Sequence, residues 1–303
     1  MDPLIVLFGL GVGVLVGLTG MGGGSLMTPI LILLFGYTPV TAVGTDLAYG
    51  AITKTVGGWR HLKHRTVNST LSTWMALGSV PAAIGGVYAL HALEEATGRS
   101  FDNVVLGVLA GTLAFTGAMV LARALFLQHL IDRERETFVM TRREKGMAVV
   151  LGVFVGFVLG VTSAGSGTLI AVGLIMLFHL APRQVVATDI FHAAILLWAA
   201  AAAHVVAGNV DYGLMGTILL GSLPGVWIGS HLSIKTPVAT LRTALGVVMI
   251  GASLGLASKA GLDVPAPLLA GVPILLFVLL AFSPVRKWLR APRTPVAAAA
   301  PER

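Results

Sequence analysis

The sequence predicts an all-α polytopic membrane protein made of two inverted repeats. Three observations lead to this fold class: the composition, a series of long apolar segments, and a duplicated pattern of polar residues. Of the 303 residues, 56% are hydrophobic and only 11% are charged. A soluble domain carries about 25% charged residues. The composition therefore excludes most soluble proteins.

The basic residues indicate orientation in a membrane rather than a nucleic-acid partner. The net charge is +7, but the Lys and Arg residues lie in short stretches between apolar runs, as they do in cytoplasmic loops of membrane proteins. We therefore expect contact with membrane lipid and no nucleic-acid partner. The chain has no cysteine, which excludes thiolate metal sites and cysteine nucleophiles. We expect no metal and no cofactor.

Each half begins with one apolar region that is too long for a single helix and is interrupted by glycine and hydroxyl residues. These regions are 3–36 and 146–180. At about 1.5 Å per residue, the arm 168–180 is too short for a hydrocarbon core of roughly 30 Å. We therefore expect each region to form a re-entrant, broken hairpin of two partial helices that enters and leaves by the same face.

Seven further apolar segments are predicted to cross the membrane, since a crossing helix needs about 20 mostly apolar residues. Three follow the first hairpin and three follow the second, and the last lies within 258–284. The seven segments are 42–58, 70–90, 103–127, 185–203, 212–232, 238–257 and 265–284.

An offset of 143 residues aligns the two halves, because it places Thr19 on Thr162 and Asp46 on Asp189. Aspartate is scarce in this chain, so this match carries more weight than matches between apolar residues. Each half has one hairpin and three crossings, and an odd number of crossings makes the second copy start from the opposite face. The expected divisions are a first repeat at 1–127, a charged connector at 128–145, a second repeat at 146–257, an extra helix at 258–284 and a tail at 285–303.

The charges predict the topology of these repeats. The basic connector 128–145 is cytoplasmic by the positive-inside rule. The N-terminus is then outside, the C-terminus is cytoplasmic, and the chain is a multi-pass protein of a bacterial inner membrane. The two hairpins enter from opposite faces, and we expect their tips to meet near the midplane. Inverted repeats with broken helices around a central site are typical of secondary transporters.

The two hairpin tips are the predicted binding site for a small anion. Glycines let the backbone approach a ligand, and the helices that begin near Ser25 and Thr168 point N–H groups and positive dipole ends toward the centre. The alternative is that these small residues only let helices pack closely. The candidate substrate-binding residues are Gly20, Met21, Gly22, Gly23, Gly24, Ser25, Thr45, Thr162, Ser163, Ala164, Gly165, Ser166, Gly167, Thr168, Thr188 and His192.

Four ionisable residues lie beside these tips, and each has two interpretations. Asp46 and Asp189 either couple protons to transport or cap a neighbouring hairpin. Lys54 either neutralises the substrate or Asp46, or extends to the membrane interface. His192 either binds an anion or relays a proton, or makes a polar contact inside the bundle.

These motifs resemble the TauE/SafE family of sulfite and organosulfonate permeases, also called TSUP. The resemblance rests on the glycine-rich hairpin followed by Pro39 and Thr45-Asp46, on its copy with Pro182 and Thr188-Asp189, and on Gly-Ser-x-Pro at 78–81 and 221–224. It implies an inner-membrane transporter of small sulfur-containing anions such as sulfite, sulfoacetate or related sulfonates, often an exporter. It also implies that the glycine-rich elements at 20–25 and 162–168 bind the substrate.

The expected function is therefore transport, by an alternating-access carrier that exports such an anion, with protons as the candidate coupling ion. An anion channel with the same site is the first alternative. A second alternative is an intramembrane hydrolase with Ser166 as nucleophile and His192 or His204 as base. Catalysis requires a nucleophile within hydrogen-bond reach of its base, which the sequence does not establish. We expect no enzyme activity.

Overall fold

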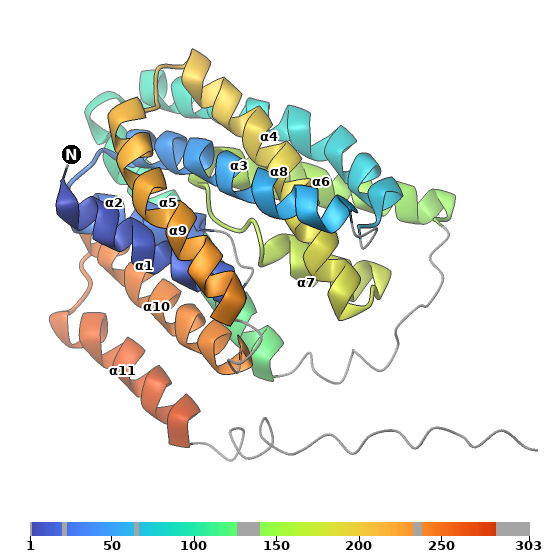
Figure 1. Ribbon diagram of the computed structural model, residues 1–303. Helices are drawn as coiled ribbons and strands as arrows, with labels where there is room; N and C mark the ends of the chain where they lie inside the picture. The colour runs from blue at the N-terminus through green and yellow to red at the C-terminus, as the bar shows by residue number, and fades with distance from the viewer. Residues whose placement is uncertain (1, 20–22, 64–66, 126–139, 233–237, 283–303) are drawn as a thin grey trace, which may run out of the picture.

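The computed structural model describes residues 2–19, 23–63, 67–125, 140–232 and 238–282, and within these ranges the chain is helical without strands (Figure 1). The first half contains α1 (Pro3–Thr19), α2 (Gly24–Leu33), α3 (Pro39–Lys63), α4 (Ser69–Thr97), a short 3-10 helix (Gly98–Ser100) and α5 (Phe101–Leu125). The second half contains α6 (Arg142–Thr162), α7 (Leu169–Phe178), α8 (Pro182–Val206), α9 (Tyr212–Leu232), α10 (Val238–Lys259) and α11 (Ala266–Phe282).

Five helical segments among the described residues are long and apolar enough to cross a membrane, and the outer surface of the bundle is apolar. Large apolar side chains such as Leu77, Phe154 and Trp227 are exposed on the outside of the bundle, whereas soluble monomers rarely expose large contiguous apolar patches. The helical segments long and apolar enough to cross a membrane are Ser69–Arg123, which contains α4 and α5, Arg142–Thr162, Gln184–Val206, Tyr212–Leu232 and Leu241–Lys259.

The helix α6 is longer than the partial helix expected in 146–180. It begins at Arg142 because Thr141 and Glu144 form a capping box, in which the Thr141 hydroxyl accepts from the Glu144 N–H and the Glu144 carboxylate accepts from the Thr141 N–H. Charged residues that the sequence assigned to the connector therefore form its first turn. By contrast, α2 and α7 have 10 residues each and are too short to cross.

Two pairs of helices cross at glycines, with α1 against α9 and α6 against α4. A Cβ at Gly13 would lie 2.8 Å from the Cα of Ser222, and a Cβ at Gly156 would lie 2.6 Å from the Cα of Ser79. Both crossings need glycine, since any side chain there would meet backbone. Gly156 and Ser222 are the 143-residue equivalents of Gly13 and Ser79. In each pair the first hairpin arm of one half thus packs on a helix of the other half.

The equivalent helices α3 and α8 run antiparallel and exchange hydrogen bonds at their ends. The hydroxyl of Thr45, near the start of α3, accepts from the N–H of Asp211 at 3.0 Å, just beyond α8. The hydroxyl of Thr188, near the start of α8, accepts from the N–H of Asn68 at 3.0 Å, just beyond α3. Asn68 and Asp211 in turn begin α4 and α9 by accepting a backbone N–H three residues later.

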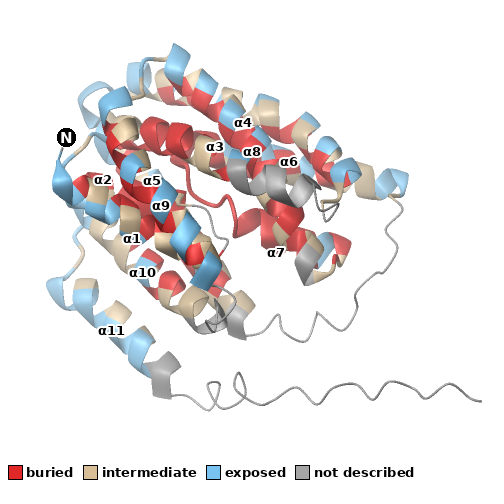
Figure 2. Ribbon diagram, in the orientation of Figure 1, coloured by how far each residue is buried: buried red, intermediate tan, exposed pale blue. Residues whose placement is uncertain are grey.

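The buried part of the bundle lies around α3, α7 and α8, and α11 lies at its edge beside α10 (Figures 1 and 2). None of the side chains described on α11, residues 266–278, is buried. In contrast, every residue from Leu159 to Ile175 is buried. The second hairpin tip therefore lies in the interior of the protein.

We expect Gly13→Ala to destabilise the fold, because its methyl group would meet the backbone of Ser222 on α9. Overpacking of this kind costs about 1–3 kcal/mol, so the thermal unfolding midpoint of the purified protein in detergent should fall. Gly11→Ala is the matched control on the same helix, since a Cβ there has no atom within 4 Å. Equal midpoints for the two variants would contradict the close crossing.

Candidate functional site

The two hairpins meet at the carboxylate of Asp46, which lies on α3. The hydroxyl of Thr28, on α2, donates to Asp46 Oδ2 at 2.7 Å, and the hydroxyl of Ser163, just after α6, donates to the same oxygen at 2.7 Å. The backbone carbonyl of Ser163 also lies directly against Gly24, where a Cβ would not fit. All four residues are buried. One carboxylate thus joins parts of both hairpins.

The second tip has a backbone that requires small residues. Ser163 adopts a left-handed conformation with φ 57°, and its N–H closes α6 by donating to the carbonyl of Leu159 at 2.8 Å. Gly165 and Gly167 follow with φ 104° and 135°, a region that other residues rarely enter. Positive φ at a non-glycine residue is uncommon and often marks a functional site. The glycines here are therefore needed for the turn itself.

Several buried donors at the tips have no partner within the described residues. The hydroxyls of Ser25, Ser166 and Thr168 make no hydrogen bond, although these residues are only 7%, 5% and 4% exposed. The backbone N–H groups of Ser166 and Gly167 are also unbonded. Among the described residues, these three hydroxyls are not completely closed off from solvent, unlike Oδ1 of Asp46 and of Asp189, so a small molecule can reach them. The tips therefore present donors to a ligand that accepts hydrogen bonds.

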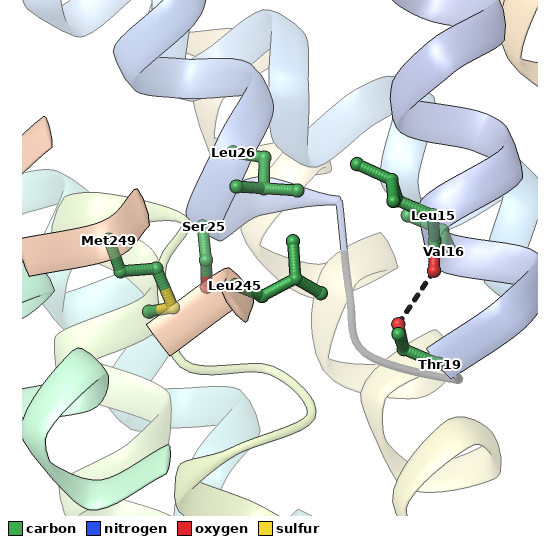
Figure 3. Close-up of a pocket in the computed structure, with 7 residues that line it drawn as sticks. All are labelled: Leu15, Val16, Thr19, Ser25, Leu26, Leu245 and Met249. Atoms are coloured by element: carbon green, nitrogen blue, oxygen red, sulfur yellow. Dashed lines mark hydrogen bonds between the residues drawn. The ribbon is translucent and has the colours of Figure 1, made fainter. Parts of the chain in front are cut away.

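A small pocket lies beside the first tip, between α1, α2 and α10 (Figure 3). Its wall is apolar apart from two hydroxyl residues, Thr19 and Ser25. The Thr19 hydroxyl donates to the carbonyl of Leu15 at 2.7 Å, so Ser25 supplies the hydroxyl that has no protein partner. The lining residues are Leu15, Val16, Thr19, Ser25, Leu26, Leu245 and Met249.

Asp189 occupies the position equivalent to Asp46 but has different surroundings. It is 3% exposed and makes no hydrogen bond to the described residues. Three positive groups act on its charge, those of Lys54, Arg123 and Arg242. In both aspartates the Oδ1 atom is buried without a partner. Asp46 is thus held by hydroxyl groups, whereas Asp189 lies in the field of positive groups that do not contact it.

Lys54 reaches the second tip from α3. Its ammonium group donates to the carbonyl of Ser166 at 3.2 Å, and the residue is only 6% exposed. The side chain therefore lies inside the bundle and links α3 to the turn that carries the unbonded N–H groups. This position places one positive charge at the tip from which Ser166 and Thr168 offer their hydroxyls.

The two candidate histidines are engaged with other groups. The ring nitrogens of His192 lie 3.4 Å from the Ser72 hydroxyl and 3.2 Å from the Ser79 hydroxyl, both on α4. His204 lies 2.9 Å from the carbonyl of Gly160 and also contacts Asn209. Within the described residues, neither ring forms a hydrogen bond with Ser166, so the nucleophile–base pair considered from the sequence is not assembled.

Comparison with known proteins assigns the chain to a family. The family model described as "Sulfite exporter TauE/SafE" matches residues 5–256. The chain belongs to the TauE/SafE family. Its site therefore lies in a membrane transporter protein, and the hairpins, the paired aspartates and Lys54 all fall within the matched residues.

Relatives of this TauE/SafE chain are also named as transporters. "Probable membrane transporter protein YjnA" of Bacillus subtilis (strain 168) is 39% identical over 256 residues, which cover 84% of this chain and 100% of the relative. "Probable membrane transporter protein YdhB" of the same organism is 27% identical over 244 residues, covering 80% and 94%. No solved structure gives a significant match.

Three of the threonines predicted to bind substrate in this TauE/SafE chain already have hydrogen-bond partners in the protein. They are Thr45, Thr162 and Thr188. Thr45 and Thr188 accept hydrogen bonds at the starts of α9 and α4, and the hydroxyl of Thr162 donates to the carbonyl of Val158 at 2.7 Å. Ala164 is buried in the second tip, and Gly23 lies against the hydroxyl of Tyr49. Gly20, Met21 and Gly22, and the side chain of His61, lie outside the described residues.

Four site residues were missed by sequence reasoning: Thr28, Tyr49, Arg123 and Arg242. Tyr49 aligns with His192 at the 143-residue offset, and this match was available from the sequence alone. Arg123 and Arg242 lie within predicted crossings, where ionisable residues are usually functional. Their position inside apolar segments is the signal that could have pointed to them. Thr28 carries no such signal, since a lone hydroxyl in an apolar helix is common.

We expect Ser163→Ala to destabilise the TauE/SafE chain, since a hydrogen bond to a charged group contributes about 1.5–3 kcal/mol and Asp46 would lose one of its two donors. The thermal unfolding midpoint should fall. Ser166→Ala is the control in the same turn, because its hydroxyl has no protein partner, and its midpoint should stay near that of the unmodified chain. An equal loss in both variants would contradict the special role of the Asp46 contact.

Proposed function

We propose that the chain is a secondary transporter of a small sulfur-containing anion, sulfite or an organosulfonate such as sulfoacetate. The observation that carries this proposal is the set of buried, unpartnered donors at the hairpin tips. Ser25, Ser166 and Thr168 offer hydroxyls, and the turn before α7 offers backbone N–H groups. A sulfite or sulfonate group has three oxygens that accept such bonds. Helix N-termini are favourable places for anions.

The arrangement of the two halves supports an alternating-access mechanism. Helices α3 and α8 run antiparallel, and the contacts between halves recur at the 143-residue offset. We infer that the repeats are inverted in the membrane, with the N-terminus outside and the C-terminus in the cytoplasm of a bacterial cell. Rocking of one repeat against the other would then expose a central site to either side.

The charges around the tips favour a substrate of negative charge. Lys54 lies at the second tip, and its ammonium group is held there by the carbonyl of Ser166. An interior-negative membrane potential favours outward movement of an anion by about 2.3 kcal/mol per charge for each 100 mV. Export therefore needs little other driving force, whereas uptake requires coupling to another gradient. We propose export as the physiological direction.

Protons are the proposed coupling ion, and the two aspartates are their proposed carriers. Asp46 faces Thr28, Ser163 and Tyr49, and Asp189 faces Lys54, Arg123 and Arg242. Protonation of either carboxylate removes a negative charge near the anion and so lowers the repulsion between them. The unpartnered Oδ1 atom of each aspartate can accept the proton.

The proposal predicts that purified protein in liposomes moves labelled sulfite, sulfoacetate or taurine. Transport should saturate and should weaken in the double variant Ser166→Ala and Thr168→Ala, which removes two donors from the second tip. Flux in protein-free liposomes is the control. No movement of any of these compounds would overturn the proposed substrate class, and unitary ionic currents would identify a channel instead of a carrier.

The proton role predicts a pH dependence that the aspartates cause. With isethionate, a sulfonate whose own charge does not change, we expect the initial rate to rise as pH falls on the side from which the anion is taken. Asp46→Asn or Asp189→Asn should flatten this profile, because an amide does not titrate. Glu95→Gln, at an exposed carboxylate near the end of α4, is the control. An unchanged profile in both asparagine variants would exclude these residues from coupling.

A further inference from the structure

Two arginines lie on neighbouring ends of α5 and α10, and one of them contacts the first hairpin. Arg123 lies near the end of α5 and Arg242 near the start of α10. The two helices are in contact there, since a Cβ at Gly246 would lie 2.9 Å from the Cδ2 atom of Leu121. Gly117 likewise lies against Ile250, so the two helices pack antiparallel and bring Arg123 and Arg242 to a similar level. The charge of Asp189 acts on both arginines.

Among the described residues, the positive charge of this region exceeds its negative charge. The contact between a basic and an acidic side chain that the described part of the chain shows joins His91 to Glu94 at 3.8 Å, so no described carboxylate directly neutralises either arginine. Of the described groups, Arg123, Arg242 and Lys54 give three positive charges against the single negative charge of Asp189. Partly buried like charges are unfavourable without a counter-charge. A bound anion would supply that counter-charge.

Arg242 is also attached to the first hairpin and its pocket. Its Nη2 and Nε atoms donate to the carbonyl of Thr19 at 2.8 Å and 3.3 Å. Thr19 lines the pocket of Figure 3, and so do Leu245 and Met249, which follow Arg242 on the same face of α10. The guanidinium group therefore lies beside a pocket whose unpartnered hydroxyl belongs to Ser25.

We propose that Arg123 and Arg242, here called the arginine site, bind the oxyanion group of the substrate before it moves to the hairpin tips. This inference rests on the proposed function and adds a second binding position to it. A planar guanidinium group donates two parallel hydrogen bonds to an oxyanion, which suits a sulfonate or sulfite. In the proposed orientation the end of α5 and the start of α10 face the cytoplasm, the side from which an exporter takes its substrate.

If Arg242 only held the first hairpin in place, its replacement would affect the maximal rate but not KM. Another basic residue on α10 provides a matched control for such a role. Lys259, at the opposite end of α10, donates to the carbonyl of Ile32 on α2 at 2.7 Å. Lys259 thus holds the second arm of the hairpin much as Arg242 holds the first, but it lies away from Asp189. Arg123 makes no hydrogen bond to the described residues, so its replacement removes charge without removing such a contact.

The test compares Arg123→Gln, Arg242→Gln and Lys259→Gln in full-length protein in liposomes of neutral phosphatidylcholine. Sulfite and isethionate are added separately to each side, and KM and maximal rate are measured. We expect KM to rise about tenfold on the side of the arginine site in both arginine variants, as for loss of one charge-assisted hydrogen bond. On the other side it should change much less, and Lys259→Gln should keep the KM of the unmodified chain on both sides.

Three results would overturn the inference. In the first, Arg123→Gln leaves KM unchanged and Arg242→Gln only lowers the maximal rate, as Lys259→Gln does, which indicates a structural clamp. In the second, the arginine effects appear only after phosphatidylglycerol is added, which assigns the site to a lipid headgroup. In the third, the unmodified chain carries neither anion. Only the third result also contradicts the proposed function. Failure of the arginine site is therefore distinguishable from failure of the proposed function.

Discussion

The buried carboxylate of Asp46 is the contact on which the relation between the two hairpins depends. It accepts one hydroxyl from α2 and another from the turn after α6, so it holds elements from both halves of the chain on a third element, α3. No cation balances this carboxylate among the described residues, and in a low-dielectric interior each hydrogen bond to it is correspondingly strong. A movement that separates the tips must break one of these bonds or carry α3 along.

Two aspartates that are equivalent in sequence have become different in chemistry. The positions equivalent to Thr28 and Lys54 in the second half are Ala171 and Leu197. Asp189 consequently lacks the hydroxyl donor that Thr28 gives to Asp46, and the one lysine at this level serves Asp189 and the second tip. The repeat therefore keeps a symmetric backbone while its charge distribution is asymmetric.

The parts of the fold that depend on local sequence patterns could be predicted. The parts that depend on contacts between residues far apart in the chain could not. Apolar runs are local, so the all-helical architecture followed from the sequence. The start of α6 did not, because a capping box at Thr141 extended the helix into a charged segment. The sequence predicted that Thr45 binds substrate. Its hydroxyl instead accepts from the N–H of Asp211, which is 166 residues away in the chain, so this contact could not be read from a local pattern. Arg123 and Arg242 lie at a similar level because α5 and α10 pack together. The spacing of apolar residues along the sequence does not show which helices pack together.

The reciprocal bonds of Thr45 and Thr188 have a consequence for the order in which the protein can complete its fold. During synthesis the N-terminal half is complete before Asp211 has been translated, so the hydroxyl of Thr45 waits for a partner from the later half. The hydroxyl of Thr188 instead finds the N–H of Asn68 already made, because Asn68 precedes it in the chain. Each half therefore supplies a backbone N–H to a hydroxyl of the other half, and both bonds are in place only once the second half has been synthesised.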